Sequence, residues 1–188
     1  GGGGPEPGSV GVAAGGVHAG GGDPGKEDEG RERQRRHDTA QLDQDMNNSA
    51  RYLKANELAN GRLGATGFCW GGGMTNRLAV ALGSDLDAGV PFYGVAAASE
   101  DVSAIEAALL IIYAGTDPRI NAMWPDYEAA LQAHGVMYEM QTFEGTLQGF
   151  HNTSTPPYKQ AAAAPAGNSP DVLCAEPPGG SGARVRRR

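Results

Sequence analysis

The stretch GFCWGGG at residues 67–73 constrains the fold of this chain most strongly. It follows a short apolar run and precedes a helix-like run at residues 74–82. A G-x-C-x-G motif between a strand and a helix is typical of a nucleophile elbow, a sharp turn that exposes one side chain at the top of a sheet. We expect side chains in place of Gly67 and Gly71 to clash with the backbone of this turn. The dipole of the following helix is expected to favour the thiolate form of Cys69.

A simpler interpretation of Cys69 stays open at this point. Glycine makes up 30 of the 188 residues, so glycines flank a given cysteine by chance with appreciable frequency. Cysteine is also often a small buried apolar residue without chemistry.

Composition divides the chain into three parts. Residues 1–37 are rich in glycine and then in mixed charge, and they cannot bury enough apolar surface to offset their backbone entropy. Residues 165–188 are rich in proline, glycine and arginine and are interpreted as a tail. We therefore expect disordered ends around one folded domain at residues 38–164, which is long enough for a modest core.

Charge and hydropathy exclude several classes of function. The chain carries a formal net charge of −7, and acidic residues outnumber basic ones in the expected domain, which argues against nucleic acid as a partner. No window holds 18 consecutive apolar residues, so we expect no membrane span. The two cysteines, Cys69 and Cys174, lie in different contexts, which favours free thiols in a reducing compartment and a cytoplasmic protein.

Hydrophobic periodicity predicts alternating helices and strands. The run ALLIIY at residues 108–113 is continuously apolar, as in a central parallel strand covered on both faces. The fold class is therefore α/β, with a mainly parallel sheet flanked by helices. Predicted helices are 40–57, 72–82, 121–134 and 158–164, and predicted strands are 62–68, 88–93, 108–113 and 136–143.

Three chemically suited residues follow predicted strands. Cys69, Asp117 and His151 occur in the order nucleophile, acid, histidine, and open α/β sheets carry their chemistry at the carboxyl ends of strands. In such a triad the acid orients the imidazole, the imidazole activates the thiol, and the N–H of Trp70 is the expected oxyanion donor. Asp117 before a proline is alternatively a turn residue, and His151 is alternatively an ordinary loop histidine.

These motifs together resemble the dienelactone hydrolase family (carboxymethylenebutenolidase-like α/β-hydrolases). The similarity covers roughly residues 38–164 and implies a partial α/β-hydrolase fold without a large cap. It also implies hydrolysis of small-molecule esters or enol-lactones through a cysteine acyl-enzyme, without cofactor or metal, and Tyr93 as part of the substrate pocket; a core tyrosine at a strand end is the alternative. The matching blocks are GFCWGGG at 67–73, PFYG at 91–94, AGTDPRINA at 114–122 and GFHN at 149–152.

The chain departs from the family pattern in three ways. The family's catalytic histidine stands immediately before the Gly-Phe of the last block, where this chain has Gln148, and an amide cannot accept a proton from a thiol. Residues 1–37 contain no strand-like run that matches the family's early strands, and the last helix is cut short, so we expect a chain truncated or divergent at both ends. A catalytically impaired or inactive hydrolase fragment is therefore the alternative function.

Overall fold

The computed structural model of this protein describes residues 39–150. These residues belong to two compact units, which divide between Arg62 and Leu63. His151 and the expectations for both ends of the chain lie outside the described residues. In the first unit, helix α2 spans Thr39–Lys54 and confirms the predicted helix, although it ends before residue 57.

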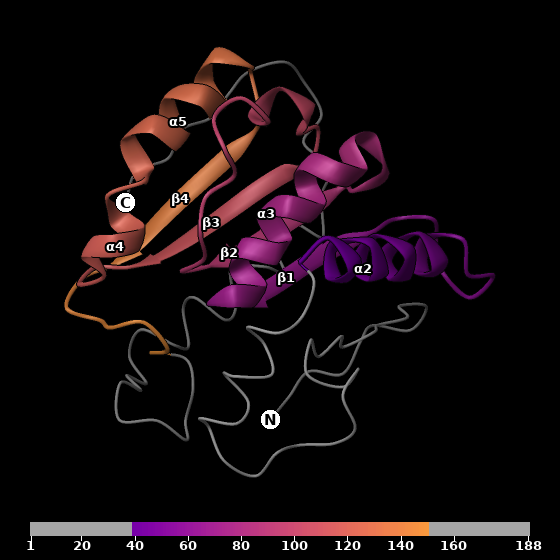
Figure 1. Cartoon of the computed structure of the whole chain (residues 1–188), viewed down its shortest axis with the longest axis horizontal. Helices are drawn as coiled ribbons and strands as arrows, with labels where there is room; N and C mark the ends of the chain where they lie inside the picture. The colour runs from indigo at the N-terminus through magenta and orange to yellow at the C-terminus, as the bar shows by residue number, and fades with distance from the viewer. Residues whose placement is uncertain (1–38, 151–188) are drawn as a thin grey trace, which may run out of the picture. The chain divides into compact units, whose positions relative to one another are not determined.

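The second unit contains a four-stranded parallel sheet (Figure 1). Its described strands pair in the order β1-β2-β3-β4, and each neighbouring pair is parallel. The structure thus confirms the expected mainly parallel sheet flanked by helices. The elements in chain order are β1 (Gly64–Phe68), α3 (Trp70–Leu82), η2 (Gly83–Asp85), β2 (Ala88–Phe92), η3 (Val102–Ala104), β3 (Ala108–Ala114), α4 (Pro118–Asn121), α5 (Trp124–Ala133) and β4 (Tyr138–Phe143).

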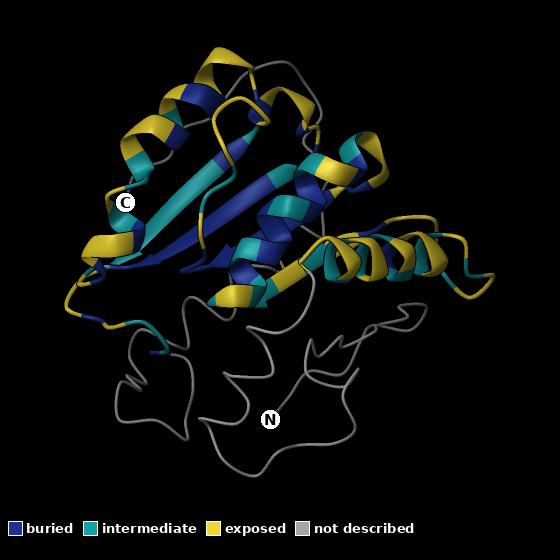
Figure 2. Ribbon diagram, in the orientation of Figure 1, coloured by how far each residue is buried: buried dark blue, intermediate teal, exposed yellow. Residues whose placement is uncertain are grey.

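The central strands are covered on both faces (Figure 2). Every residue of β2 is buried, and β3 is buried from Leu109 to its end, as the continuous apolar run predicted. In β1, by contrast, exposed and half-buried residues alternate. The core side chains therefore gather on β2 and β3. Cys69, Asp117 and Gln148 lie beyond the carboxyl ends of β1, β3 and β4.

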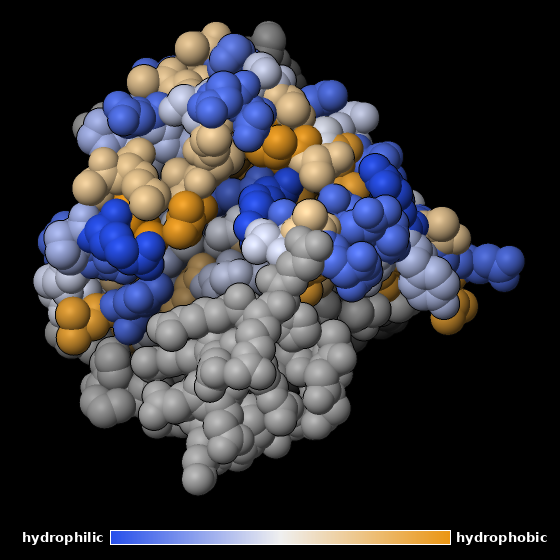
Figure 3. All heavy atoms as spheres, in the orientation of Figure 1, coloured by the Kyte–Doolittle hydropathy of each residue, from blue (hydrophilic) through white to orange (hydrophobic). Residues whose placement is uncertain are grey.

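Helices α3 and α5 lie over the same face of the sheet (Figure 1). The Tyr127 hydroxyl of α5 donates a hydrogen bond of 3.1 Å to Oδ1 of Asn76 in α3. Trp124 of α5 packs edge-on against Tyr113 and Tyr138, with ring centroids 5.8 Å and 5.9 Å apart. Figure 3 shows hydrophilic residues over much of this side, with hydrophobic ones scattered between them.

The predicted helix 121–134 is wrong in its boundaries. Two helices occupy this region: the Asp117 side chain caps α4 at its start, and Pro125 stands in the first turn of α5. Proline lacks the N–H that a helix interior requires but suits a first turn, so the chain begins a new helix there. The last strand likewise begins at Tyr138 rather than at residue 136.

Glycine backbone allows α3 to approach the sheet unusually closely. A Cβ on Gly72 would lie 2.5 Å from the carbonyl oxygen of Phe92, and one on Gly94 would lie 2.2 Å from the backbone of Gly72. A Cβ on Gly67 would lie 2.3 Å from the carbonyl oxygen of Gly71, as expected for the sharp turn. The same expectation for Gly71 is wrong, because its Cβ direction meets nothing within 4 Å.

Replacement of Gly72 by alanine tests this close packing. The added methyl has no room against β2, so we expect Gly72→Ala to lower the free energy of unfolding by about 1–3 kcal/mol. Gly71→Ala is the matched control on the same helix, and we expect it to be neutral or stabilising because alanine is the better helix former. Thermal melts of both variants measure the difference; equal stabilities would contradict the close approach.

Candidate active site

Cys69 stands at a strained turn between β1 and α3. Its backbone has φ 53° and ψ −113°, a left-handed conformation that a non-glycine residue rarely adopts. The turn is held by a hydrogen bond from the Cys69 N–H to the carbonyl of Phe92, 3.0 Å, and by one from the Gly73 N–H to the carbonyl of Cys69, 3.2 Å. Strain of this kind concentrates at functional sites. The sharp turn predicted from the G-x-C-x-G motif is therefore present.

Trp70 follows the cysteine as the first residue of α3. At that position the helix offers its N–H no acceptor, because the first N–H groups of a helix lie beyond the intrahelical ladder. Trp70 is 42% exposed, and the guanidinium of Arg77 lies 5.9 Å from the centroid of its ring. The expected oxyanion donor thus belongs to the same turn that presents the thiol.

Asp117 lies in the loop after β3 and is only 8% exposed. Its Oδ1 accepts a hydrogen bond of 3.1 Å from the N–H of Ile120 and so caps α4. Its Oδ2 is buried and has no hydrogen-bond partner in the described part of the chain. Buried polar atoms are rarely left unpaired, so this oxygen is suited to accept a proton donor such as an imidazole N–H. The turn interpretation and the catalytic interpretation of Asp117 are both compatible with this geometry.

Gln148 reaches the sulfur of Cys69 from the loop after β4. Its side chain hydrogen-bonds the Cys69 thiol, and its Nε2 donates a long hydrogen bond of 3.5 Å to the carbonyl of Tyr93. The residue that precedes Gly149-Phe150 therefore does face the cysteine, as a base at that position would. The group present is an amide, which donates and accepts hydrogen bonds but takes up no proton.

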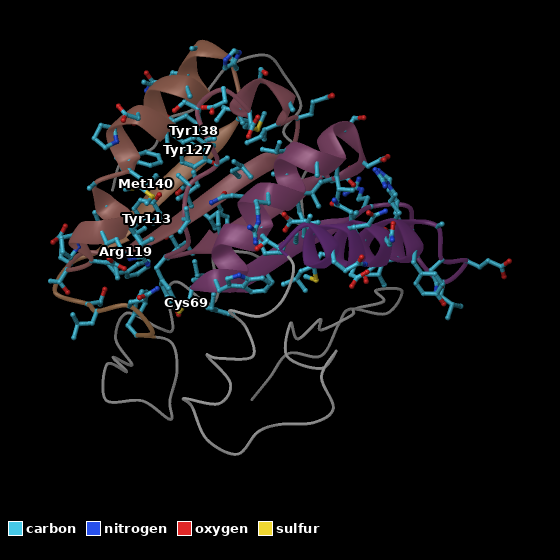
Figure 4. The ribbon with its side chains drawn as sticks, in the orientation of Figure 1. Cys69, Tyr113, Arg119, Tyr127, Tyr138 and Met140 are labelled. Carbon is cyan, nitrogen blue, oxygen red and sulfur yellow. The ribbon has the colours of Figure 1, made fainter. Side chains whose placement is uncertain are left out.

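Burial governs the protonation of the thiol. Burial raises the pKa of Cys69 above its ordinary value; the hydrogen bond from Gln148 lowers it, the charge of Asp117 raises it, and the charge of Arg119 lowers it. The pKa of Cys69 is thus raised overall, against the expectation that the helix terminus favours the thiolate. Figure 4 shows Cys69 and Arg119 toward the same end of the sheet. The sequence interpretation missed Arg119, although a basic residue two positions after the candidate acid was a usable signal.

Tyr93 directly follows β2 and lies beside the cysteine. It is 1% exposed, has the positive φ of 37°, and packs against Phe92 and Phe150 in the apolar cluster that also contacts Cys69. Burial raises the pKa of the Tyr93 hydroxyl, and the charge of a Cys69 thiolate raises it further. The geometry places Tyr93 next to the thiol as a packed side chain.

The part of the chain that the structure describes contains neither a metal-binding cluster nor a membrane-spanning helix. Within residues 39–150, no three His, Cys, Asp or Glu side chains are grouped so that they could hold a metal ion. No helix in that range combines the length and apolar character that a membrane crossing requires.

Comparison with known proteins agrees with these features. The sequence profile of the dienelactone hydrolase family matches residues 12–169. The carboxymethylenebutenolidase homologs of Mus musculus and Homo sapiens are 31% and 32% identical over 112 residues, which are 58% of this chain and 45% of each relative. The chain thus spans about half the length of these curated relatives. The crystal structure of dienelactone hydrolase from Anabaena variabilis matches with a TM-score of 0.59 at 19% identity, over 79% of this chain and 68% of that one, and shows the α/β-hydrolase fold.

The effect of the Asp117 charge on the pKa of Cys69 can be tested by replacing Asp117. Asp117→Asn keeps the cap of α4 but removes a charge that raises the pKa of Cys69, so the thiolate fraction near neutral pH increases. We expect alkylation of Cys69 by iodoacetamide to accelerate roughly threefold, the size of a partly screened charge interaction. The measurement uses a Cys174→Ser background, and Asp126→Asn on α5 is the matched control. A slower or unchanged rate in Asp117→Asn contradicts the assigned electrostatics.

Proposed function

We propose that this chain, which belongs to the dienelactone hydrolase family, hydrolyses small esters or enol-lactones with Cys69 as the nucleophile. The observation that carries the proposal is the cysteine at the strained turn between β1 and α3, where the side chain is presented at the helix N-terminus. A buried acid with an unpaired oxygen, Asp117, acts electrostatically on the same thiol. Family membership supports the hydrolase class, and this geometry supports the cysteine mechanism.

The proposed reaction has two steps. The Cys69 thiolate adds to the ester carbonyl, the oxyanion is stabilised by the Trp70 N–H, and the C–O bond breaks to leave a thioester and an alcohol. Water then attacks the thioester, which releases the carboxylic acid and restores the thiol. His151 is the proposed base, Asp117 its orienting acid, and Tyr93 a wall of the substrate pocket. No step requires a metal or a cofactor.

An impaired hydrolase is the second candidate, and the contact between Gln148 and Cys69 favours it. The amide occupies the neighbourhood of the sulfur from which a base would act, and it cannot accept the proton of the thiol. The raised pKa of Cys69 acts in the same direction, because it leaves little thiolate near neutral pH. In this candidate function, the chain retains the arrangement of the family's active site but hydrolyses esters much more slowly.

The cellular location and the partners of the protein are proposed from its thiol and its charge. A nucleophilic cysteine must remain reduced, so we propose a cytoplasmic location. The proposed partner is a small-molecule ester or lactone, with no nucleic acid, since the chain carries a net charge of −7, and no membrane.

Removal of the thiol tests the nucleophile. We expect Cys69→Ala to reduce hydrolysis of p-nitrophenyl acetate to the rate in buffer alone, because no other group completes the elbow. The reaction is followed by release of p-nitrophenol, with Cys174→Ser as the control that retains the elbow cysteine. Turnover by Cys69→Ala equal to that of the parent chain refutes the cysteine mechanism.

Restoration of an imidazole tests the second candidate. We expect Gln148→His to raise the turnover of p-nitrophenyl acetate by about 100-fold, since general base catalysis contributes at least about that much. Gln141→His on β4 is the control for a histidine introduced away from the thiol. If Gln148→His leaves turnover unchanged while the melt stays cooperative, the position does not serve the site.

A further inference from the structure

Two threonines join the loop that follows β3 to the loop that follows β4. The carbonyl of Thr146 accepts both the Thr116 N–H, at 3.0 Å, and the Thr116 hydroxyl, at 2.5 Å. Thr146 is 1% exposed, and its own hydroxyl donates at 2.6 Å to the carbonyl of Phe143, the last residue of β4. The two loops are thus connected by hydrogen bonds beyond the point where the strands end.

The backbone supports the same connection. The Gly115 N–H donates a hydrogen bond of 2.9 Å to the carbonyl of Phe143. A Cβ on Gly115 would lie 2.9 Å from Cα of Glu144, so the first loop runs directly against the second. Because both contacts are between backbone atoms, the two loops are expected to move as one body.

Each loop carries one of the groups that act on Cys69. Asp117 directly follows Thr116, and Gln148 stands two residues after Thr146. We propose that Thr116 is a positioning residue: its hydroxyl, bonded to Thr146, holds the Asp117 loop and the Gln148 loop in register at Cys69. The proposal rests on the proposed function in taking Cys69 as the reacting group, but it concerns geometry that can be measured on the thiol itself.

Because Thr116 is exposed, its positioning role can be tested separately from a role in core packing. Its side chain is exposed, so its replacement by valine opens no cavity in the core. Thr66 provides a matched control: it is exposed as well, and its hydroxyl donates at 3.1 Å to the carbonyl of Val90 on the neighbouring strand. Thr116→Val and Thr66→Val therefore remove the same kind of hydrogen bond, the first between the loops after β3 and β4 and the second between β1 and β2.

The expected effect follows from the groups that face the thiol. These are Gln148, Asp117, Arg119 and Tyr93. In the native chain, the hydrogen bond from Gln148 lowers the pKa of Cys69, and the charge of Asp117 raises it by a smaller amount. Loss of the register weakens both effects, and the loss of the larger one, from Gln148, decides the result. The pKa of the thiol therefore rises, and less thiolate is present near neutral pH.

Alkylation of Cys69 by iodoacetamide across a range of pH tests the proposal, in full-length chains that carry Cys174→Ser. We expect Thr116→Val to slow the reaction about fivefold near neutral pH, the size of one ordinary intramolecular hydrogen bond. We also expect the midpoint of the alkylation profile to move to higher pH. We expect Thr116→Ser and Thr66→Val to be alkylated at the rate of the parent chain. The double variant Thr116→Val/Gln148→Ala is expected to be alkylated no more slowly than the slower of its two single variants. Thr116→Ala is measured alongside, so that the comparison survives if the valine variant fails to fold.

An unchanged alkylation profile in Thr116→Val and Thr116→Ala overturns the proposal. So does an equal slowing in Thr66→Val, which would indicate general loosening, or strict additivity with Gln148→Ala. These outcomes are independent of ester turnover. A chain that shows the expected alkylation pattern but hydrolyses no ester keeps the positioning role of Thr116 and loses the proposed function.

Discussion

The close backbone contact between α3 and the end of β2 is the constraint on which the site depends. Gly72 and Gly94 leave no room for a Cβ between them, so the first turn of α3 rests directly on the chain that leaves β2. The hydrogen bond from the Cys69 N–H to Phe92 joins the elbow to the same point. The close contact and this hydrogen bond together support the cysteine at a positive φ that an unsupported chain would relax.

The groups around the Cys69 thiol shift its pKa in opposite directions. Burial and the charge of Asp117 raise the pKa of Cys69, whereas the amide of Gln148 and the charge of Arg119 lower it. A thiol in this balance reacts when something removes its proton, and the side chain that hydrogen-bonds it is the amide of Gln148. The chemistry of the centre therefore depends on how precisely the two loops after β3 and β4 present their side chains.

Much of the fold could be predicted from local sequence patterns. The apolar run of β3 indicated a strand buried on both faces, and the G-x-C-x-G motif indicated a strand, a tight turn and a helix; the structure confirms all of these. Other predictions failed. The prediction for Gly71 was wrong because its Cβ direction is open in the folded chain, and the bounds of the predicted helix 121–134 were wrong because Pro125 favours the first turn of a new helix. The catalytic roles of Cys69 and Asp117 stay predictions.

The sequence by itself determined which residue types follow which strands, because strand and helix periods and the positions of glycine are local properties of the chain. It also determined that position 148 is an amide. Only the tertiary structure decided that this amide contacts the cysteine, that burial raises the pKa of Cys69, and that Thr116 bonds Thr146. Distances between loops far apart in sequence and the loss of solvent around a thiol arise only when the strands pair, so no local pattern encodes them.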